Sequence, residues 1–427
     1  MSGKSEEKRE KKVVSRKLAI ILGAVCIVIL VGSVVAIGMQ ASKISSLNNQ
    51  IKLLNSQITN LQNSLSTQSK NATNLLNSLI TSASTSPPFA VGAAGTLTSA
   101  FGSVLNTFET MYPSITVAPP IFEGSGLVAA TENTTKQFSL EAAADTTTMP
   151  KYLFTQLADY EIAFGQTQMV IIVNLKSSAG LELYNMWEGV NETTVMSTSW
   201  NQTWIDMFNL IALNSSTKVG ISNPFTDPSG YQGAGMIRLA GLTFFGNASY
   251  YYYALYNNPS KYYMANTEED LVPLMQTQHI DFIISAYMSN AIPQTGNSTQ
   301  TGIAYITLPD AVNLGVLSDL SYYHEANMEG SLFSALPGYM PQEATESFTI
   351  NPVTYTVTIP KVSTNAAAAT LFLTTLFSQS GQNILKQDGI TPLTPALVYG
   401  NDASVPSILS SFTTQVNSTY SSLFPGS

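Results

Sequence analysis

The sequence predicts an α/β protein of two lobes, preceded by a transmembrane helix and a coiled-coil stalk. Three observations predict it: an uncharged apolar run spans Leu18 to Gly38, a heptad pattern of Ile and Leu follows, and beyond Phe89 short β-rich runs alternate with helical stretches. Such alternation is typical of parallel sheets with crossover helices. The more than 330 residues after Phe89 favour two lobes over one.

The composition is poor in charge. Charged residues make up 11% of the 427 residues and apolar residues 44%, so Ser, Thr, Asn, Gln and Tyr must form most of the polar surface. Such a surface fits a location where carboxylates are weakly ionised or where glycans cover the protein. The single cysteine, Cys26, lies inside the apolar run, so no intramolecular disulfide can form.

The apolar run predicts a membrane-spanning helix at residues 18–38. Its 21 residues would extend about 31 Å as a helix, which matches a bilayer core. Seven Lys and Arg precede it within residues 1–17, whereas the next 30 residues carry only Lys43 and Lys52. This bias predicts a cytoplasmic basic tail at 1–17 and places the bulk of the chain outside the cell membrane. A cleaved secretory signal is the alternative.

The stalk is predicted at residues 42–81. Apolar residues recur there at three-four spacing: Ile44, Leu47, Ile51, Leu54, Ile58, Leu61, Leu65, Ala72, Leu75 and Leu79. Ile at one core position and Leu at the other favour a parallel dimer, and five heptads would span roughly 55 Å. The alternatives are a trimer or a lone amphipathic helix packed on the domain. Residues 82–88 (SASTSPP) are expected to be a linker.

Sequons of the Asn-x-Ser/Thr type predict N-glycosylation of the outer part of the chain. All eight lie downstream of the apolar run: Asn71, Asn133, Asn191, Asn201, Asn214, Asn247, Asn297 and Asn417.

Several segments resemble one family in the same order. Ala94-Gly95-Thr96-Leu97 precedes an expected helix, and Glu123-Gly124-Ser125-Gly126 ends an expected strand. The most specific segment is Ser222-Asn223-Pro224-Phe225-Thr226-Asp227-Pro228-Ser229-Gly230-Tyr231, and Leu308-Pro309-Asp310 and Thr358-Ile359-Pro360 follow. These segments are similar to motifs of the archaeal tungstate/molybdate-binding proteins of ABC transporters.

The resemblance implies a type II periplasmic-binding-protein fold with a hinge between its lobes. Lobe I would take residues 89–167 plus about 351–427, and lobe II residues 168–350. It also implies capture of an oxyanion for an ABC importer, with a transporter permease as partner. Tungstate or molybdate is the first ligand to expect, another oxyanion such as sulfate the second, and a neutral solute the third.

Four residues are predicted to bind the ligand: Thr96, Ser125, Asp227 and Tyr305. Thr96 and Ser125 each follow a strand and a glycine, where hydroxyl and backbone N–H groups can face an anion. The alternatives are a plain N-cap and an ordinary tight turn. In the resembled family the Asp at position 227 donates oxygen to tungsten or molybdenum; a cap of its own turn is the alternative. Tyr305 aligns with an anion-binding tyrosine, although strand tyrosines often only pack.

The chain departs from the family pattern at one point. Where the family has a second metal-binding glutamate, this chain has Ser285-Ala286-Tyr287. The second carboxylate is therefore missing there, and the site would hold a tetrahedral anion through hydroxyl and N–H groups. Cationic help is scarce because Arg238 is the only arginine beyond the anchor region.

Other classes of function find little support. His279 and His324 are far apart and have no partners at metal spacing, so no resident metal or cofactor is expected. No motif of an enzyme appears in a matching context. Beyond residue 17 the net charge is −13, with 11 Lys and Arg against 24 Asp and Glu, which argues against nucleic acid. The alternative function is a structural or adhesive envelope protein in which the same fold has a decayed site.

Overall fold

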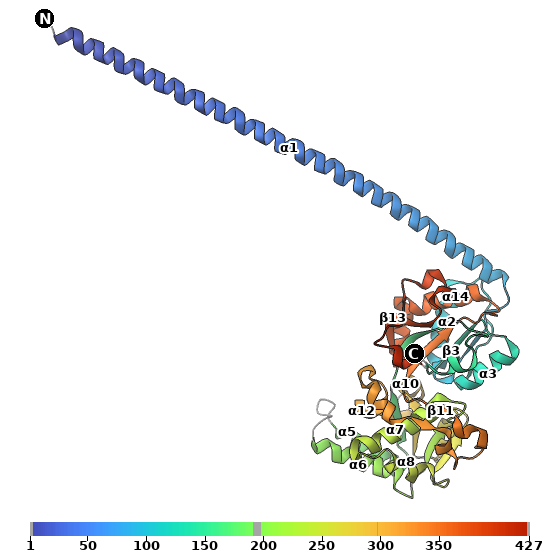
Figure 1. Cartoon of the computed structure of the whole chain (residues 1–427). Helices are drawn as coiled ribbons and strands as arrows, with labels where there is room; N and C mark the ends of the chain where they lie inside the picture. Colours follow the sequence, from blue (N-terminus) through green and yellow to red (C-terminus); the bar gives the residue numbers. More distant parts are fainter. Residues whose placement is uncertain (1–2, 191–197, 297, 425–427) are drawn as a thin grey trace. The chain divides into compact units, whose positions relative to one another are not determined.

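The part of the chain beyond the long N-terminal helix folds into two α/β lobes. The computed structural model describes residues 3–190, 198–296 and 298–424. By its contacts the chain divides into residues 1–77 and residues 78–427. The second unit contains a seven-stranded sheet and a five-stranded sheet, each covered by helices (Figure 1). We call the part built on the seven-stranded sheet lobe I and the part built on the five-stranded sheet lobe II. The predicted α/β class with two lobes is confirmed.

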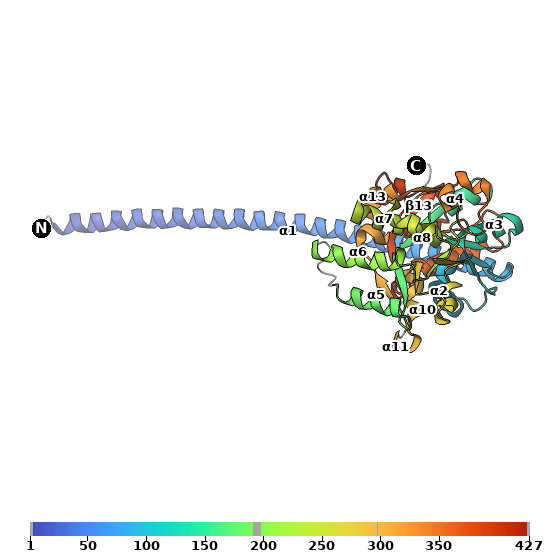
Figure 2. The same ribbon diagram turned by 90° about the horizontal axis from the view of Figure 1, so that it is seen from below.

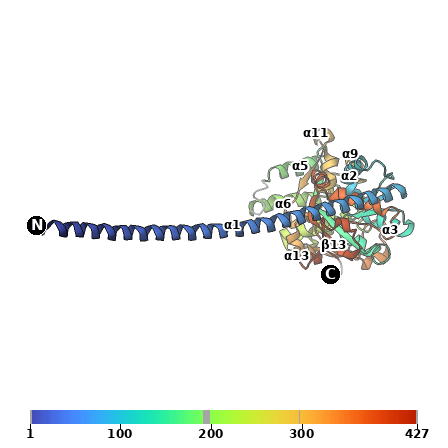
Figure 3. The same cartoon turned by 90° about the horizontal axis from the view of Figure 1, so that it is seen from above.

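The N-terminal helix α1 runs without a break from Gly3 to Thr85 (Figures 2 and 3). Its stretch from Leu18 onward is long and apolar enough to cross a membrane. Apart from the half-buried Leu79, the apolar side chains of the predicted span and of the predicted heptad are exposed, for example Ile29 at 61% and Leu54 at 55%. A solvent-exposed apolar surface of this extent needs a lipid or protein partner.

The end of α1 belongs to the folded unit. Ala83 is buried, and the Asn365 side-chain amide donates to Ala83 O at 3.0 Å and to Pro87 O at 2.8 Å. Residues 82–88, where a linker is expected, therefore begin as helix and are held by hydrogen bonds to lobe I.

Lobe I is a mixed sheet in the order β14-β13-β4-β12-β3-β1-β2. Its strands are β1 (Val91–Ala94), β2 (Ile121–Glu123), β3 (Leu140–Ala143), β4 (Tyr160–Gln166), β12 (Thr354–Thr358), β13 (Thr391–Gly400) and β14 (Thr413–Gln415). Its helices are η1 (Gly95–Leu97), α2 (Thr98–Met111), α3 (Ser125–Thr135), α4 (Thr148–Tyr152), α14 (Ala366–Phe377), α15 (Gln379–Gln387), η7 (Asp402–Ser404), η8 (Ser407–Leu409) and η9 (Ser421–Leu423).

Lobe II is a mixed sheet in the order β7-β6-β8-β5-β9. Its strands are β5 (Met169–Asn174), β6 (Val219–Ser222), β7 (Tyr262–Ala265), β8 (Phe282–Tyr287) and β9 (Ile303–Thr307), with a separate pair of β10 (Met328–Glu329) and β11 (Ser347–Phe348). Its helices are α5 (Ser178–Glu188), α6 (Thr198–Ala212), α7 (Pro228–Phe245), α8 (Ser249–Tyr256), α9 (Leu271–Gln276), α10 (Met288–Thr295), α11 (Ser298–Thr301), α12 (Asp310–Asn313), η3 (Leu317–Asp319), α13 (Leu320–Tyr323), η4 (His324–Ala326), η5 (Gly330–Phe333) and η6 (Pro341–Thr345).

The two sheets share one topology, in which a strand arriving from the other lobe is inserted antiparallel to its neighbours. In lobe I that strand is β12, between β3 and β4, and in lobe II it is β5, between β8 and β9. The chain crosses between lobes at Thr167 and returns near Val353, and Thr167 N donates to Val353 O at 3.0 Å. The two crossings therefore lie side by side, which is the arrangement of a double hinge.

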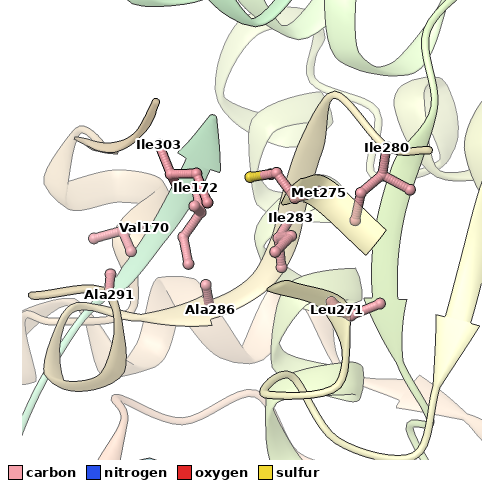
Figure 4. Close-up of a cluster of buried hydrophobic side chains, with 9 residues drawn as sticks. All are labelled: Val170, Ile172, Leu271, Met275, Ile280, Ile283, Ala286, Ala291 and Ile303. Carbon is pink, nitrogen blue, oxygen red and sulfur yellow. The ribbon is translucent and has the colours of Figure 1, made fainter. Parts of the chain in front are cut away.

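Each lobe has its own apolar core. In lobe I, Phe89, Phe101, Phe108 and Phe372 pack with ring centroids 5.3–6.0 Å apart. In lobe II a cluster of buried aliphatic side chains packs against the sheet (Figure 4): Val170, Ile172, Leu271, Met275, Ile280, Ile283, Ala286, Ala291 and Ile303. The two lobes are rigid and are joined by two short crossings. The residues at the ends of the strands are therefore held in defined positions between the lobes.

Candidate functional site

Five helices, counting the short η1 that leads into α2, begin where strands end at the boundary between the lobes. In lobe I, η1 and α2 follow β1, and α3 follows β2, which is parallel to β1. In lobe II, α7 follows β6 and α10 follows β8, which is parallel to β6. The first N–H groups of each helix have no partner within the helix, so these helix starts favour negatively charged or oxygen-rich groups.

The lobes touch closely at these helix starts. A Cβ atom added to Gly124 would lie 2.5 Å from Thr226 O of the other lobe, so only glycine fits. Tyr231 Oη donates to Asp145 Oδ2 across the boundary at 2.8 Å, and Lys151 pairs with Glu346. Beside these contacts is an interlobe cleft of about 490 Å³, lined by residues of both lobes: Gly126, Asp145, Thr147, Thr148, Pro150, Lys151, Tyr152, Pro224, Phe225, Thr226, Asp227, Pro228, Tyr231, Glu346, Ser347, Phe348 and Thr349.

Asp227 is the N-cap of α7. Its Oδ1 accepts from Ser229 N at 3.2 Å and its Oδ2 from Ser229 Oγ at 3.0 Å, and Pro228 occupies the first helical position. Both carboxylate oxygens are thus engaged in their own turn. The Asp227 carboxylate therefore fixes the start of α7. Within the described ranges, no group of three or more His, Cys, Asp and Glu is arranged to hold a metal ion.

Two further carboxyl groups lie beside Asp227, from the loop between β7 and α9. Ser229 Oγ is 2.9 Å from Glu268 Oε2, so Glu268 and Asp227 share this hydroxyl. Burial, and then the nearby Asp227 and Glu269, raise the pKa of Glu268 well above its ordinary value. Burial and then Asp227 raise the pKa of Glu269 to about 7. Both groups therefore keep their protons at pH values at which a carboxyl group is usually ionised.

Sequence reasoning missed Glu268 and Glu269. Their signal is the acidic run Glu268-Glu269-Asp270 directly after β7, in a chain with only 11% charged residues. β7 is parallel to β6, so the run lies at the same edge of the sheet as Asp227.

A second cavity, of about 240 Å³, lies at the starts of α2 and α10. We call it the α2 cavity; its lining comes from both lobes and consists of Gly95, Thr96, Thr98, Ser99, Glu269, Ser289, Asn290, Pro293 and Gln294. Four buried polar atoms of this lining make no hydrogen bond to any residue that the structure describes: Thr96 Oγ1, Glu269 Oε1, Asn290 Nδ2 and Gln294 Oε1. Buried polar groups are normally paired, so these atoms indicate a place for a polar ligand or water.

The donors of the α2 cavity are held in defined orientations. Asn290 Oδ1 accepts from Tyr287 N at 3.0 Å, which leaves its Nδ2 as the free donor. Ser289 Oγ and Tyr355 Oη are 2.6 Å apart and join α10 of lobe II to β12 of lobe I. Burial raises the pKa of Tyr355, so this hydroxyl stays protonated. The lining thus offers neutral donors without a cationic side chain.

Three of the four predicted ligand residues lie at the lobe boundary but do not share a cavity: Thr96 lines the α2 cavity, Asp227 lines the interlobe cleft, and Ser125 lines neither. Thr96, Ser125 and Asp227 all lie at the helix starts, and all three are buried. Ser125 Oγ accepts from Ala144 N at 3.0 Å, so its hydroxyl also fixes the start of α3 to the end of β3. Tyr305 is apart from them, on the edge strand β9 opposite Ile172, where its ring packs against the lobe II core cluster.

The position of the family's second glutamate is structural here. Ser285 Oγ accepts from Ser222 N at 3.0 Å, and Ala286 belongs to the core cluster of Figure 4. Arg238 is also structural, since its Nε donates to Ala326 O at 3.1 Å and its guanidinium lies over the Tyr252 ring.

Comparisons with known proteins cover the two lobes. Residues 89–391 match the family model of the bacterial extracellular solute-binding proteins. An uncharacterized solute-binding protein of Sulfurisphaera tokodaii is 30% identical over 252 residues, which are 58% of this chain and 60% of that protein. One from Saccharolobus solfataricus is 26% identical over 326 residues, 72% of each chain. The molybdate/tungstate-binding protein WtpA of Pyrococcus abyssi is 24% identical over 300 residues, 65% of this chain and 76% of that protein.

Proposed function

Because this chain belongs to the bacterial extracellular solute-binding protein family, whose members are transport components and not enzymes, we propose that it captures a small oxyanion between its lobes and delivers it to an ABC importer. Tungstate or molybdate is the first candidate. The name of the Pyrococcus abyssi relative supports this ligand class. Sulfate is the second candidate, because it has the same tetrahedral shape.

The α2 cavity is the observation that carries the proposal. It lies where η1 leads into α2, at a helix start that favours an anion, and its lining includes the unpaired donors Thr96 Oγ1 and Asn290 Nδ2. Its walls come from both lobes, so a bound anion would hold the lobes together. Neutral donors can bind an oxyanion tightly when water is excluded, since hydrogen bonds to a charged group are strong in a region of low dielectric constant.

The N-terminal helix supplies the proposed anchor and stalk. Residues 18–38 would span the membrane once, with the basic tail at 1–17 in the cytoplasm and the lobes outside. The exposed heptad residues of α1 would pair with a second copy to form a dimeric stalk. Of the eight sequons, Asn191 and Asn297 lie outside the described residues, and the other six asparagines are exposed, as attachment of a glycan requires.

Thermal unfolding of the full chain in detergent tests the proposal. Ligands that bind only the folded state raise Tm, by an amount that corresponds to roughly 2.7 kcal/mol at a concentration of 100 Kd. We expect millimolar tungstate or molybdate to raise Tm by several degrees, and sulfate to raise it less. Chloride at matched ionic strength is the control. Absence of a shift with all three oxyanions contradicts oxyanion capture.

A further inference from the structure

The Glu269 carboxyl group of lobe II lies against the backbone of Gly95 in lobe I. A Cβ atom added to Gly95 would be 2.7 Å from Glu269 Oε2 and 2.8 Å from Oε1, so glycine alone leaves room for the carboxyl group. Gly95 is the first residue of η1, directly before α2. Glu269 thus lies at the start of the helix that the proposed function assigns to the anion.

The groups that face Glu269 leave it without a counter-charge. Asp227 at the start of α7 and Glu268 on the same loop are both acidic, and Tyr355 on β12 adds a neutral hydroxyl. From α10 the cavity receives Ser289, Asn290 and Gln294, and from η1 and α2 Thr96, Thr98 and Ser99. Ser99 Oγ donates to Asp388 Oδ1 at 3.2 Å, which places another carboxyl group behind it. None of the residues described as lining the α2 cavity is a Lys, Arg or His.

Other buried atoms of the α2 cavity lining also lack hydrogen-bond partners among the described residues. Thr96 is 3% exposed and Asn290 is 4% exposed, and both have a side-chain atom that is buried in the cavity lining without a partner among the described residues. Thr96 Oγ1 and Asn290 Nδ2 can donate to an anion. Glu269 Oε1, which is also unpaired, can donate only when the carboxyl group carries its proton.

We propose that Glu269 makes solute capture depend on protonation: as a neutral acid it donates a hydrogen bond to the oxyanion in the α2 cavity and keeps its proton, and as a carboxylate it repels the anion from the same place. This inference rests on the proposed function and adds its regulation. The described lining of the cavity has no Lys, Arg or His. The protonated Glu269 would therefore supply the hydrogen-bond donor that a Lys or Arg supplies in other anion sites. Capture is then favoured in acidic surroundings and release in neutral or alkaline ones.

The direction of the pH dependence follows from the titration of Glu269. Its pKa is raised to about 7 by burial and by Asp227, and a bound anion raises it further. The anion affinity is therefore greatest below that pKa. Above it, affinity falls by about tenfold for each pH unit, because one proton must be taken up for each anion bound.

Calorimetric titration of the full chain in detergent with micromolar tungstate, between pH 5 and pH 8.5, tests the inference. Glu269→Gln keeps a neutral donor at the same place and does not titrate, and Glu109→Gln, on the exposed face of α2, is the matched control. The anion's own protonation affects all three proteins equally and cancels in their comparison. Buffers of different ionisation enthalpy report the number of protons taken up.

We expect wild type and Glu109→Gln to lose affinity by about tenfold per pH unit above pH 7 and to take up about one proton per anion. Glu269→Gln is expected to show a flatter pH profile than wild type, because its amide group does not titrate. Parallel profiles in wild type and Glu269→Gln overturn the role of Glu269 and leave oxyanion capture intact. Absence of binding by wild type at every pH overturns both.

Discussion

Tyr231 of lobe II donates its hydroxyl to Asp145 of lobe I, with 2.8 Å between Oη and Oδ2. Asp145 also accepts from Thr147 N, Thr147 Oγ1 and Thr148 N, so its carboxylate is fixed at the end of β3. Burial and then Asp145 raise the pKa of Tyr231, so the hydroxyl remains a donor. The bond joins two rigid groups across the boundary and stabilises contact between the lobes.

Tyr231→Phe is expected to weaken solute capture. Loss of a buried hydrogen bond to a charged acceptor costs about 1–3 kcal/mol. The substitution therefore destabilises the state in which the lobes touch. Calorimetry with tungstate should show a Kd raised by roughly five- to 150-fold. Tyr322→Phe is the control, because Tyr322 Oη pairs with Thr243 Oγ1 inside lobe II. Equal effects of the two substitutions would count against a bond specific to the lobe boundary.

Gly124→Ala is expected to hold the lobes apart. Its methyl group would lie 2.5 Å from Thr226 O, a backbone atom that cannot turn away. Tungstate affinity should fall by at least about tenfold, while each lobe keeps its own core and the Tm of the protein without added anion changes little. Gly102→Ala on α2 is the control, since nothing lies within 4 Å of the added atom. Unchanged affinity in Gly124→Ala would show that capture does not need this contact.

The protein is expected to be more stable in acid than at neutral pH. Burial raises the pKa of Glu161 and of Glu141 well above the ordinary 4.5, and it also raises the pKa of Glu132. A carboxyl group whose pKa is higher in the folded state than in the unfolded state contributes its full stabilisation below about pH 4.5. This stabilisation is lost as the pH rises through the pKa of the group in the folded state. Thermal unfolding at pH 4 and pH 8 checks the sign.

Tm is expected to change by about 2–4 °C for each unit by which the pKa of one group is higher in the folded state than in the unfolded state. Glu161→Gln should reduce the difference between the two pH values, and Glu109→Gln, with an exposed side chain, should not. A Tm that is higher at pH 8 than at pH 4 would contradict the assignment. Stability in acid agrees with the low content of charged residues.

The proposed stalk predicts pairing between two copies of α1. In a Cys26→Ser background, Leu54→Cys places a thiol on the heptad seam, and Ser56→Cys places one on the opposite face as a control. Mild oxidation of membranes should convert the first variant, and not the second, into a disulfide-linked dimer visible on non-reducing gels. Equal cross-linking of both variants would argue for random collision.

The sequence predicted the large-scale organisation well. The apolar run, and the alternation of β-rich and helical segments, specify local structure that neighbours in the chain determine, and the structure confirms α1 and the α/β lobes. For Asp227, a cap of its own turn was the alternative to a role in ligand binding, and the structure shows the residue as the N-cap of α7. What a residue does at such a start depends on its partners elsewhere in the fold.

The partners could not be read from the chain. Glu269 contacts Gly95 from a loop 174 residues away, and no pattern in either segment specifies that approach. Tyr305 shows the converse: its position in a strand could be predicted, but the face it presents depends on how β9 pairs with β5. The vacancy at Ser285 was interpreted as the loss of a carboxylate, whereas Glu268 and Glu269 supply carboxyl groups from another loop.

Equilibrium dialysis of the full chain against micromolar tungstate at pH 5, with bound tungsten counted by mass spectrometry, tests the central claim most directly. Oxyanion capture in the α2 cavity predicts one tungsten per chain in the wild type. It also predicts at least about tenfold weaker retention in Thr96→Val, which keeps the shape of the side chain and removes the donor. Tungsten in the wild type at the level of a protein-free blank, or equal retention by Thr96→Val, would contradict it.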